Sequence, residues 1–406
     1  MKKRPFYWGL LWMVLLAAWQ CRRPATKTED DRLENLQALT QQIRQALAPD
    51  ARDHVFEAHW SFDSMGRYQV RLVSDVPQVR QALTDSLARV PLAVDVEWTL
   101  LPEPPFDTLH GVVDVSVAQL RTRPDHRAEL ASQVLMGMPV ELAQQRGGFY
   151  RVRTPEGYWG WMDTASVAVM NDRQWARWLA APKVIMMENY GQIYDTLSPE
   201  AAQVSDWVRN DVVRLLGEEA GAYRVQLPGG REGYLPESQA VTLEEWENLN
   251  RRFAGPRDVV DDALRHYQGI PYLWGGTSVK ALDCSGFIKN LYQSYGILLP
   301  RDASQQARVV HPVPLDERLD SLEPGDLLFF GRRDAEGNAH VTHVALYIGR
   351  GRVIHATGRV KVESLLPGDS LYNDRRRKSL LSAGRIFGYY DKRIYPYYTT
   401  RGGQAK

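Results

Sequence analysis

The chain has 406 residues, enough for two to four average domains, so a single small scaffold is excluded. Hydrophobic residues make up 44% and charged residues 24%, which excludes wholesale disorder, collagen and coiled-coil arrays. The 50 Lys and Arg residues balance 49 Asp and Glu residues, and both signs are spread along the chain. Because no basic patch stands out, nucleic acid is excluded as a partner.

The N-terminus has the plan of an export signal. A basic stretch at residues 2–4 precedes an apolar run from Phe6 to Trp19, and Cys21 follows. The run is shorter than the roughly 20 apolar residues of a spanning helix, although an uncleaved anchor is the alternative. A cysteine in this place resembles the lipoprotein signal. We therefore expect residues 1–21 to be a signal peptide, Cys21 to carry lipid, and the protein to be exported to the periplasm or cell envelope and anchored to the membrane.

Residues 22–106 predict a small α+β unit of unknown role. Apolar residues at helical spacing predict a helix from Asp30 to Leu47. Alternating patterns predict strands at 54–60, 68–73 and 93–101, with a helix at 76–87 between the last two. Closely spaced prolines after residue 101 mark the first linker.

Residues 107–172 predict a small all-β barrel, because short extended segments recur between turn signals. The segments Gly147–Val152 and Gly157–Trp161 are similar to the strand, turn and strand core of a bacterial SH3-like domain. A second copy is predicted at 183–246, after a helical connector that contains two tryptophans. Tyr150 and Tyr223 occupy matching places in the two copies, 73 residues apart, which favours tandem barrels.

Residues 247–400 have a mixed pattern, with helices predicted at 258–266 and 285–295 and strands at 326–330, 342–348 and 352–356. Cys284 stands at the start of an amphipathic helix, where free N–H groups favour thiolate, so we expect a lowered pKa. The alternative is a small buried hydrophobe, the commoner fate of a free cysteine. A base is needed beside a nucleophilic thiol, and His343 and His355 fall on adjacent predicted strands. His343 lies on the face opposite the apolar row of its strand.

Six ordered motifs in this segment resemble the NlpC-type family of cell-wall cysteine peptidases, which have a papain-like fold. They are Tyr272–Gly276, Asp283–Phe287, Leu299–Asp302, Pro324–Asp326, His343–Gly349 and Ile354–Ala356. The resemblance implies that Cys284 is the nucleophile, that His343 is the base and that His355 orients this base. It also implies a set of residues that line the substrate site: Tyr272, Asp283, Ser285, Asp302 and Ser304.

The tandem barrels narrow the resemblance to the dipeptidyl-peptidase VI type, which cuts the bond between γ-D-glutamate and the diamino acid of murein stem peptides. In such enzymes the first SH3-like domain closes one end of the cleft and binds the free amine of L-Ala. An acidic residue and a tyrosine suit an ammonium group, so Glu129 and Tyr158 are the candidates, with Trp161 as a wall. The alternative is that Tyr158 and Trp161 are barrel core.

The fold class expected is therefore multidomain: an α+β papain-like cysteine peptidase domain, preceded by two SH3-like barrels and a small N-terminal α+β unit. The expected function is hydrolysis of murein peptides or peptidoglycan by a monomer. No cofactor is needed, and His340 with His343 lack the further ligands of a zinc site. The basic run at 375–378 is expected to be a solvated loop. A non-catalytic wall-binding lipoprotein, and a thiol amidase or acyltransferase on the same fold, remain alternatives.

Overall fold

The computed structural model describes residues 27–63, 66–253 and 255–399. The chain divides into two compact units, one ending at Leu101 and the other beginning at Pro102. The division falls slightly before residue 106, where the sequence placed the end of the N-terminal unit. Each unit has a hydrophobic core of its own.

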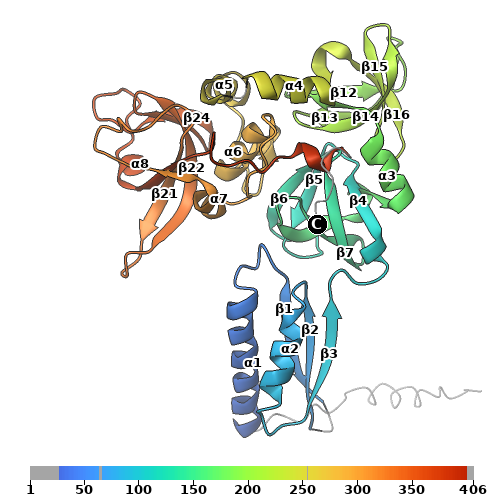
Figure 1. The fold of residues 1–406 in the computed structure, drawn as a ribbon, viewed down its shortest axis with the longest axis vertical. Coiled ribbons are helices and arrows are strands. Elements are labelled where there is room, and N and C mark those ends of the chain that lie inside the picture. The colour runs from blue at the N-terminus through green and yellow to red at the C-terminus, as the bar shows by residue number, and fades with distance from the viewer. Residues whose placement is uncertain (1–26, 64–65, 254, 400–406) are drawn as a thin grey trace, which may run out of the picture. The chain divides into compact units, whose positions relative to one another are not determined.

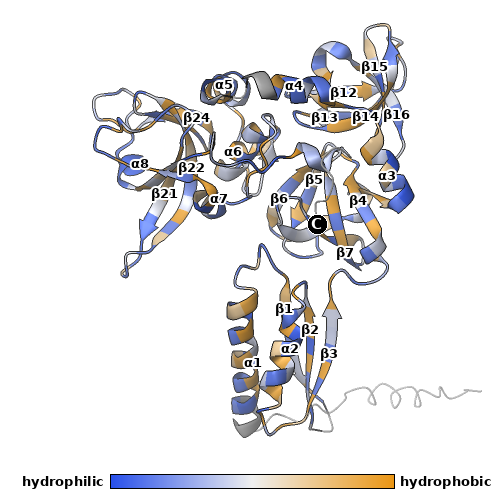
Figure 2. Cartoon of the chain, viewed as in Figure 1, coloured by the Kyte–Doolittle hydropathy of each residue, from blue (hydrophilic) through white to orange (hydrophobic). Residues whose placement is uncertain are grey.

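The first unit packs two helices on a three-stranded sheet. Its elements are α1 (Lys27–Leu47), β1 (Phe56–Phe62), β2 (Tyr68–Ser74), α2 (Gln78–Leu87) and β3 (Val94–Leu100). The strands lie in the order β1-β2-β3, and β2 pairs with β3 in parallel because α2 serves as the crossover. Polar and apolar residues alternate along α1, as its amphipathic pattern predicts (Figure 2). Ile43 of α1 and Leu83 of α2 are buried against Leu72 of the sheet.

The second unit begins with a seven-stranded barrel. Its elements are η1 (Phe106–Thr108), β4 (Leu109–Val113), β5 (Val117–Arg121), β6 (Leu130–Leu135), β7 (Pro139–Arg146), β8 (Phe149–Arg153), β9 (Trp159–Asp163), η2 (Thr164–Ser166) and β10 (Val167–Asn171). The strand order is β10-β4-β7-β8-β9-β5-β6. The sequence missed β4 and β10, which form one edge of the sheet. Helix α3 (Asp172–Ala180) follows, with the Asn171 side chain capping its first turn.

A second barrel repeats the first. Its elements are β11 (Lys183–Met186), β12 (Tyr190–Tyr194), β13 (Gln203–Val208), β14 (Val212–Glu219), β15 (Ala222–Gln226), β16 (Glu232–Pro236), η3 (Glu237–Gln239) and β17 (Ala240–Thr242). The order β13-β12-β16-β15-β14-β11-β17 is the order of the first barrel read from its other edge. A helix, α4 (Leu243–Phe253), follows this barrel too. The identical topology confirms the predicted tandem pair.

The last domain is an antiparallel six-stranded sheet with helices. Its helical segments are α5 (Pro256–Asp262), η4 (Ala263–Tyr267), α6 (Cys284–Gln293), α7 (Ala303–Val309), α8 (Asp374–Lys378) and η5 (Tyr395–Tyr397). Its sheet has the order β20 (His311–Val313), β25 (Leu380–Arg385), β21 (Leu327–Arg333), β22 (Ala339–Gly349), β23 (Arg352–Thr357) and β24 (Arg359–Ser364). A two-stranded ribbon, β18 (Thr277–Ser278) and β19 (Ala281–Leu282), precedes α6. Every residue of α6 is buried, and the sheet is covered on both faces.

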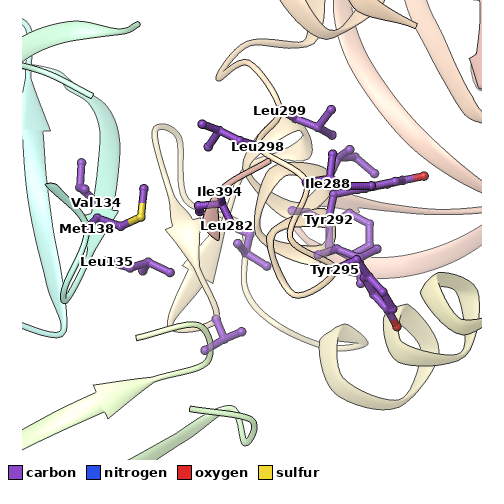
Figure 3. Close-up of a cluster of buried hydrophobic side chains, with 14 of the residues drawn as sticks. Val134, Leu135, Met138, Leu282, Ile288, Tyr292, Tyr295, Leu298, Leu299 and Ile394 are labelled. Carbon is purple, nitrogen blue, oxygen red and sulfur yellow. The ribbon is translucent and has the colours of Figure 1, made fainter. Parts of the chain in front are cut away.

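The first barrel and the last domain share one hydrophobic core (Figure 3). Val134 and Met138 of the barrel belong to the same buried cluster as Leu282 and Ile394. Two polar contacts reinforce the boundary: the Thr277 backbone N–H donates to Gln133 Oε1 at 2.9 Å, and the Lys289 and Glu156 side chains form a buried ion pair at 3.2 Å. Because the boundary is packed like a domain interior, the barrel is a fixed part of the surroundings of α6.

Candidate active site

Cys284 is the first residue of α6. The Asp283 carboxylate caps the helix by accepting from the Gly286 N–H at 2.7 Å. A side chain at Gly286 would have its Cβ 1.9 Å from the Gly276 carbonyl oxygen, so this close turn requires glycine. The backbone N–H groups of Ser285 and Val344 face the sulfur. Since Val344 follows His343 on β22, the thiol lies against the strand that carries the candidate base.

The predicted lowering of the thiol pKa is wrong. Cys284 is only 7% exposed, and burial, followed by the nearby Asp283 carboxylate, raises its pKa to about 11. The N–H groups of Val344 and Ser285 act in the opposite direction but are outweighed. Desolvation of the charged form is the stronger effect here. The unliganded site therefore holds a neutral thiol at physiological pH.

His343 and His355 are in direct contact. His343 Nε2 lies 2.9 Å from His355 Nδ1, and the two rings are nearly perpendicular at 88°. Burial lowers the pKa of both rings; for His343 the Arg376 guanidinium and His355 add to this effect. Both imidazoles are therefore neutral at pH 7, so His343 has a lone pair available to take a proton.

A carboxylate stands behind His355. Glu363 on β24 places Oε2 3.0 Å from His355 Nε2, an ion-pair distance, although the contact is not aligned as a hydrogen bond. Lys361 Nζ lies 2.8 Å from Glu363 Oε1, and Asn373 Nδ2 donates to Oε2 at 3.0 Å. The contact with His355, followed by that with Lys361, holds the pKa of Glu363 well below its usual range.

The basic run at 375–378 is not simply a solvated loop, which corrects the prediction. It belongs to α8, and Arg376 lies half-buried over the Phe330 ring, 5.2 Å from its centroid. Arg377 donates to the Glu317 carbonyl at 2.8 Å. Arg376 lowers the pKa of His343, and its Nε has no hydrogen-bond partner within the described residues. Its positive charge is therefore part of the site.

Asp283 and Ser285, which flank Cys284 at the start of α6, are both buried. The Arg301 guanidinium forks to the two oxygens of Asp283 and donates to Ser285 Oγ at 2.9 Å. Asp283 Oδ2 also accepts from the Gly275 N–H at 3.0 Å. These contacts hold the helix start against the loop before it. Arg301 belongs to the Leu299–Asp302 motif, but the sequence did not predict it as a site residue.

Tyr272, in contrast, is half-buried next to the thiol. Burial, followed by the charges that Cys284 and Asp283 would carry, raises its pKa to about 12. Its hydroxyl is therefore a neutral donor in the working pH range. Ser304 lies part-buried on the first turn of α7.

The candidate amine-binding residues come from two domains. The Tyr158 hydroxyl of the first barrel lies 3.5 Å from Asp302 Oδ2, at the outer limit of a hydrogen bond. Glu129 of the same barrel accepts from Trp274 Nε1 at 2.7 Å. Trp161, however, is buried in the barrel with the Arg151 guanidinium 4.5 Å from its ring centroid. The structure thus joins Glu129 and Tyr158 to loops of the last domain and gives Trp161 a core position.

Cys21 lies outside the described residues. Among residues 27–63, 66–253 and 255–399, no three His, Cys, Asp or Glu side chains are grouped so that they would hold a metal ion. No helix within the same ranges is long and apolar enough to cross a membrane.

The arrangement of a cysteine at a helix start beside a histidine pair on a sheet defines a papain-like cysteine peptidase. The sequence profile of the NlpC/P60 family matches residues 269–381, and that of the bacterial dipeptidyl-peptidase SH3 domain matches residues 120–167. The chain belongs to the NlpC/P60 family, and it is a cysteine peptidase.

Two relatives and one solved structure match a larger part of the chain than residues 269–381. The γ-D-glutamyl-L-lysine dipeptidyl-peptidase of Bacillus cereus is 30% identical over 251 residues, 59% of this chain and 71% of that protein. The dipeptidyl-peptidase 6 of Lysinibacillus sphaericus is 28% identical over 288 residues, 69% of this chain and all of that protein. The crystal structure of an NlpC/P60 family protein from Bacillus cereus has a TM-score of 0.57 and 26% identity, and the match covers 70% of this chain and 100% of that one.

Proposed function

We propose that this peptidase hydrolyses the bond between γ-D-glutamate and the diamino acid of murein stem peptides that have a free N-terminal L-Ala. The observation that carries the proposal is that the loop before Cys284 also contacts the first barrel. The Gly275 N–H donates to Asp283, which precedes the thiol, and the neighbouring Trp274 donates to Glu129 of the barrel. The choice of bond is supported by the Bacillus cereus relative, which is a γ-D-glutamyl-L-lysine dipeptidyl-peptidase. Because the scissile bond is an amide, thiol chemistry through an acyl-enzyme is suitable.

The first half of the reaction starts from a neutral thiol and a neutral imidazole. His343 takes the thiol proton as Cys284 Sγ attacks the γ-carbonyl carbon of D-glutamate. The backbone N–H groups of Cys284 and Ser285 at the start of α6 donate to the developing oxyanion. The C–N bond then breaks, His343 gives the proton to the leaving amine of the diamino acid, and a thioester remains on Cys284.

The second half regenerates the enzyme. His343 takes a proton from water as the water oxygen attacks the thioester carbon. The C–S bond breaks, the proton returns to sulfur, and the dipeptide L-Ala-γ-D-Glu leaves. His355 orients the ring of the base through its contact of 2.9 Å with His343 Nε2. The scheme uses side chains, backbone groups and water.

Recognition of the free amine is assigned to the boundary between barrel and peptidase domain. An L-Ala ammonium is a hydrogen-bond donor with a full charge, which the Glu129 and Asp302 carboxylates and the Tyr158 hydroxyl can accept. Tyr272, next to the thiol, supplies a donor for the substrate, while Asp283 and Ser285 keep the helix start in place. A peptide whose amine is acylated or joined to glycan lacks the charge and is expected to bind poorly.

We also propose that the protein is exported and held at the cell envelope through lipid on Cys21. The basic stretch, the short apolar run and the cysteine after it support this proposal. Feeding cells a labelled fatty acid should label the wild-type protein and leave the Cys21→Ser variant unlabelled. Labelling of both, or of neither, would contradict the lipid anchor.

The substrate is tested by mass spectrometry of products. L-Ala-γ-D-Glu-diaminopimelate and its N-acetylated analogue are incubated separately with wild type and with Cys284→Ala. Release of L-Ala-γ-D-Glu from the free tripeptide by wild type alone is the expected result. Cleavage by Cys284→Ala would refute the nucleophile, and equal cleavage of both peptides would refute recognition of the amine.

A matched pair of variants tests the amine site. Glu129→Gln should raise KM for the free tripeptide by about 10- to 100-fold, the worth of one hydrogen bond to a charged group. Glu141→Gln makes the same change at an exposed position of the same barrel and should leave KM unchanged. Equal KM values for the two variants would show that Glu129 does not meet the ammonium.

A further inference from the structure

We infer that Glu363 is a positioning residue that fixes the tautomers of both histidines, so that three residues stand in series behind Cys284: His343, His355 and Glu363. The inference deepens the proposed function, since it rests on His343 being the base. It does not depend on which peptide is cut. Glu363 lies on β24, a strand that the sequence did not predict.

The Glu363 carboxylate is held in place from several sides. Lys361 and Asn373 contact its two oxygens at 2.8 and 3.0 Å, and Arg376 Nε lies 3.8 Å from Oε2. The side chain is 10% exposed, so water has little access to it. Because cationic and amide donors surround it, Glu363 stays ionised and acts only as an acceptor.

The fully buried ring of His355 must satisfy two neighbours at once. Its Nε2 faces Glu363 Oε2 at 3.0 Å, and its Nδ1 faces His343 Nε2 at 2.9 Å. A neutral imidazole has one N–H and one lone pair. Since an ionised carboxylate cannot donate, the proton of His355 belongs on Nε2, and Nδ1 becomes the acceptor. The Thr357 hydroxyl, 3.2 Å from the same Nδ1, can donate to it as well.

The lone pair on His355 Nδ1 in turn fixes the tautomer of His343. Its Nε2 must donate to the lone pair of His355 Nδ1, so its own Nδ1 is left without a proton. This is the nitrogen that can take the thiol proton of Cys284. If His355 instead carried its proton on Nδ1, His343 would have to carry its proton on Nδ1 and could not act as the base. Glu363 thereby acts on the thiol through two rings without touching substrate.

Other charged groups also surround the histidine pair. Arg376 and Lys361 are cations close to the histidines, and Cys284 is neutral at physiological pH. Arg376 opposes protonation of both rings and Lys361 opposes that of His355, whereas Glu363 is the anion that favours it for both. His343 becomes an imidazolium during the attack. Glu363 is therefore the group that stabilises this positive charge, and it does so through the intervening ring of His355.

The kcat and KM of the full-length Glu363→Gln variant test whether Glu363 positions the two histidines. The variant keeps the size of the side chain and removes its charge, so kcat should fall about 10- to 100-fold, as for other groups that orient a functional imidazole. KM should stay within about twofold because Glu363 is remote from substrate. Glu336→Gln, an exposed glutamate of the same domain, is the matched control and should retain full kcat. An unchanged kcat in Glu363→Gln, or a loss confined to KM, would overturn the inference.

A double-mutant cycle separates positioning from general damage. In a His355→Asn background the path from Glu363 to the base is already broken, so adding Glu363→Gln should cause no further loss of kcat. Losses that multiply would show that Glu363 acts by another route and would overturn the inference.

A spectroscopic measurement tests the tautomers without any turnover. Long-range proton–nitrogen spectra of histidine-labelled Cys284→Ala protein should show the Nε2–H tautomer for both His343 and His355. In the Cys284→Ala, Glu363→Gln protein His343 should acquire the Nδ1–H form. Nδ1–H rings in the first protein, or identical spectra in the two, would refute the inference. Wild type that cleaves no murein peptide would refute the proposed substrate, while these spectra would still decide the tautomers.

Discussion

Cys284 lies where two physical effects oppose each other. The start of α6 offers N–H groups that favour a thiolate, while the surrounding core favours the neutral thiol. Burial is stronger because the sulfur is almost completely removed from water. In the proposed mechanism the attack on substrate therefore has to be coupled to proton transfer, so the protonation state of His343 is decisive.

Alkylation by iodoacetamide tests the state of the thiol. In a Cys21→Ser background, the rate at Cys284 should rise with pH toward about 11, because only thiolate reacts and the pKa is raised. A free thiol such as glutathione, with a pKa of about 8.5 to 9, provides the reference curve. A rate that is already constant between pH 6 and 8 would show a preformed thiolate and contradict the expectation.

The fall in kcat/KM at acid pH is expected to report the pKa of His343. Its folded pKa lies below its ordinary value, so the ring stays neutral and active as pH falls through 6.5. The loss of kcat/KM should therefore have its midpoint below pH 6.5. Arg376→Gln removes a cation that opposes protonation of His343 and should move the midpoint to higher pH, whereas the exposed neighbour Arg375→Gln should not. A midpoint above pH 7 in wild type would contradict the neutral pair.

At the scale of elements, the loop before α6 connects the nucleophile to the first barrel. Its backbone at Gly275 donates to the Asp283 carboxylate, and the neighbouring Trp274 donates to Glu129. Gly275 has a φ of 81°, and a Cβ there would lie 2.2 Å from the Leu130 carbonyl oxygen. The loop can therefore approach the barrel closely only because this residue is glycine.

Gly275→Ala is expected to separate loop and barrel. The left-handed backbone alone costs about 1 to 2 kcal/mol with a side chain, and the close contact adds to it, so Tm should fall by several degrees. The shift also moves Trp274 away from Glu129, so KM for the free tripeptide should rise. Gly148→Ala, where a Cβ meets nothing within 4 Å, is the control and should match wild type in both measurements. Wild-type Tm for Gly275→Ala would be incompatible with this geometry.

The sequence was most successful at long, strongly periodic elements. The helix at Cys284 and the strands of His343 and His355 were predicted near their observed bounds, because one buried face repeats along each of them. It missed β24 and α8, which carry Glu363 and Arg376. The alternation of Val360 and Val362 with polar residues is the signal by which β24 could have been found. It covers only one short strand next to loops, so it is easily overlooked.

At the scale of the whole molecule, the two units have separate cores. Ile43 and Leu72 belong to the cluster of the first unit, and the cluster that contains Leu135 and Leu282 belongs wholly to the second. All the residues of the candidate site lie after Pro102. The chain that starts at Pro102 therefore contains every residue of the proposed site.

A protein of residues 102–406 should keep kcat and KM for the free tripeptide within about twofold of full length, because it retains an intact core of its own. Thermal unfolding of the shorter protein should lack a transition that full length shows for residues 27–101. A large loss of activity in a folded, shortened protein would assign the first unit a part in catalysis.

The sequence by itself predicted the order of the domains, the tandem barrels, and Cys284, His343 and His355 as the candidate catalytic residues, because local periodicity and ordered motifs encode these features. Only the tertiary structure decided the neutral state of the thiol, since burial depends on what packs around a residue. It also decided the places of Glu363, Arg376 and Arg301, whose partners lie on other elements of the chain. Long-range contacts of this kind leave no periodic trace, so their electrostatic effects become visible only once the chain is folded.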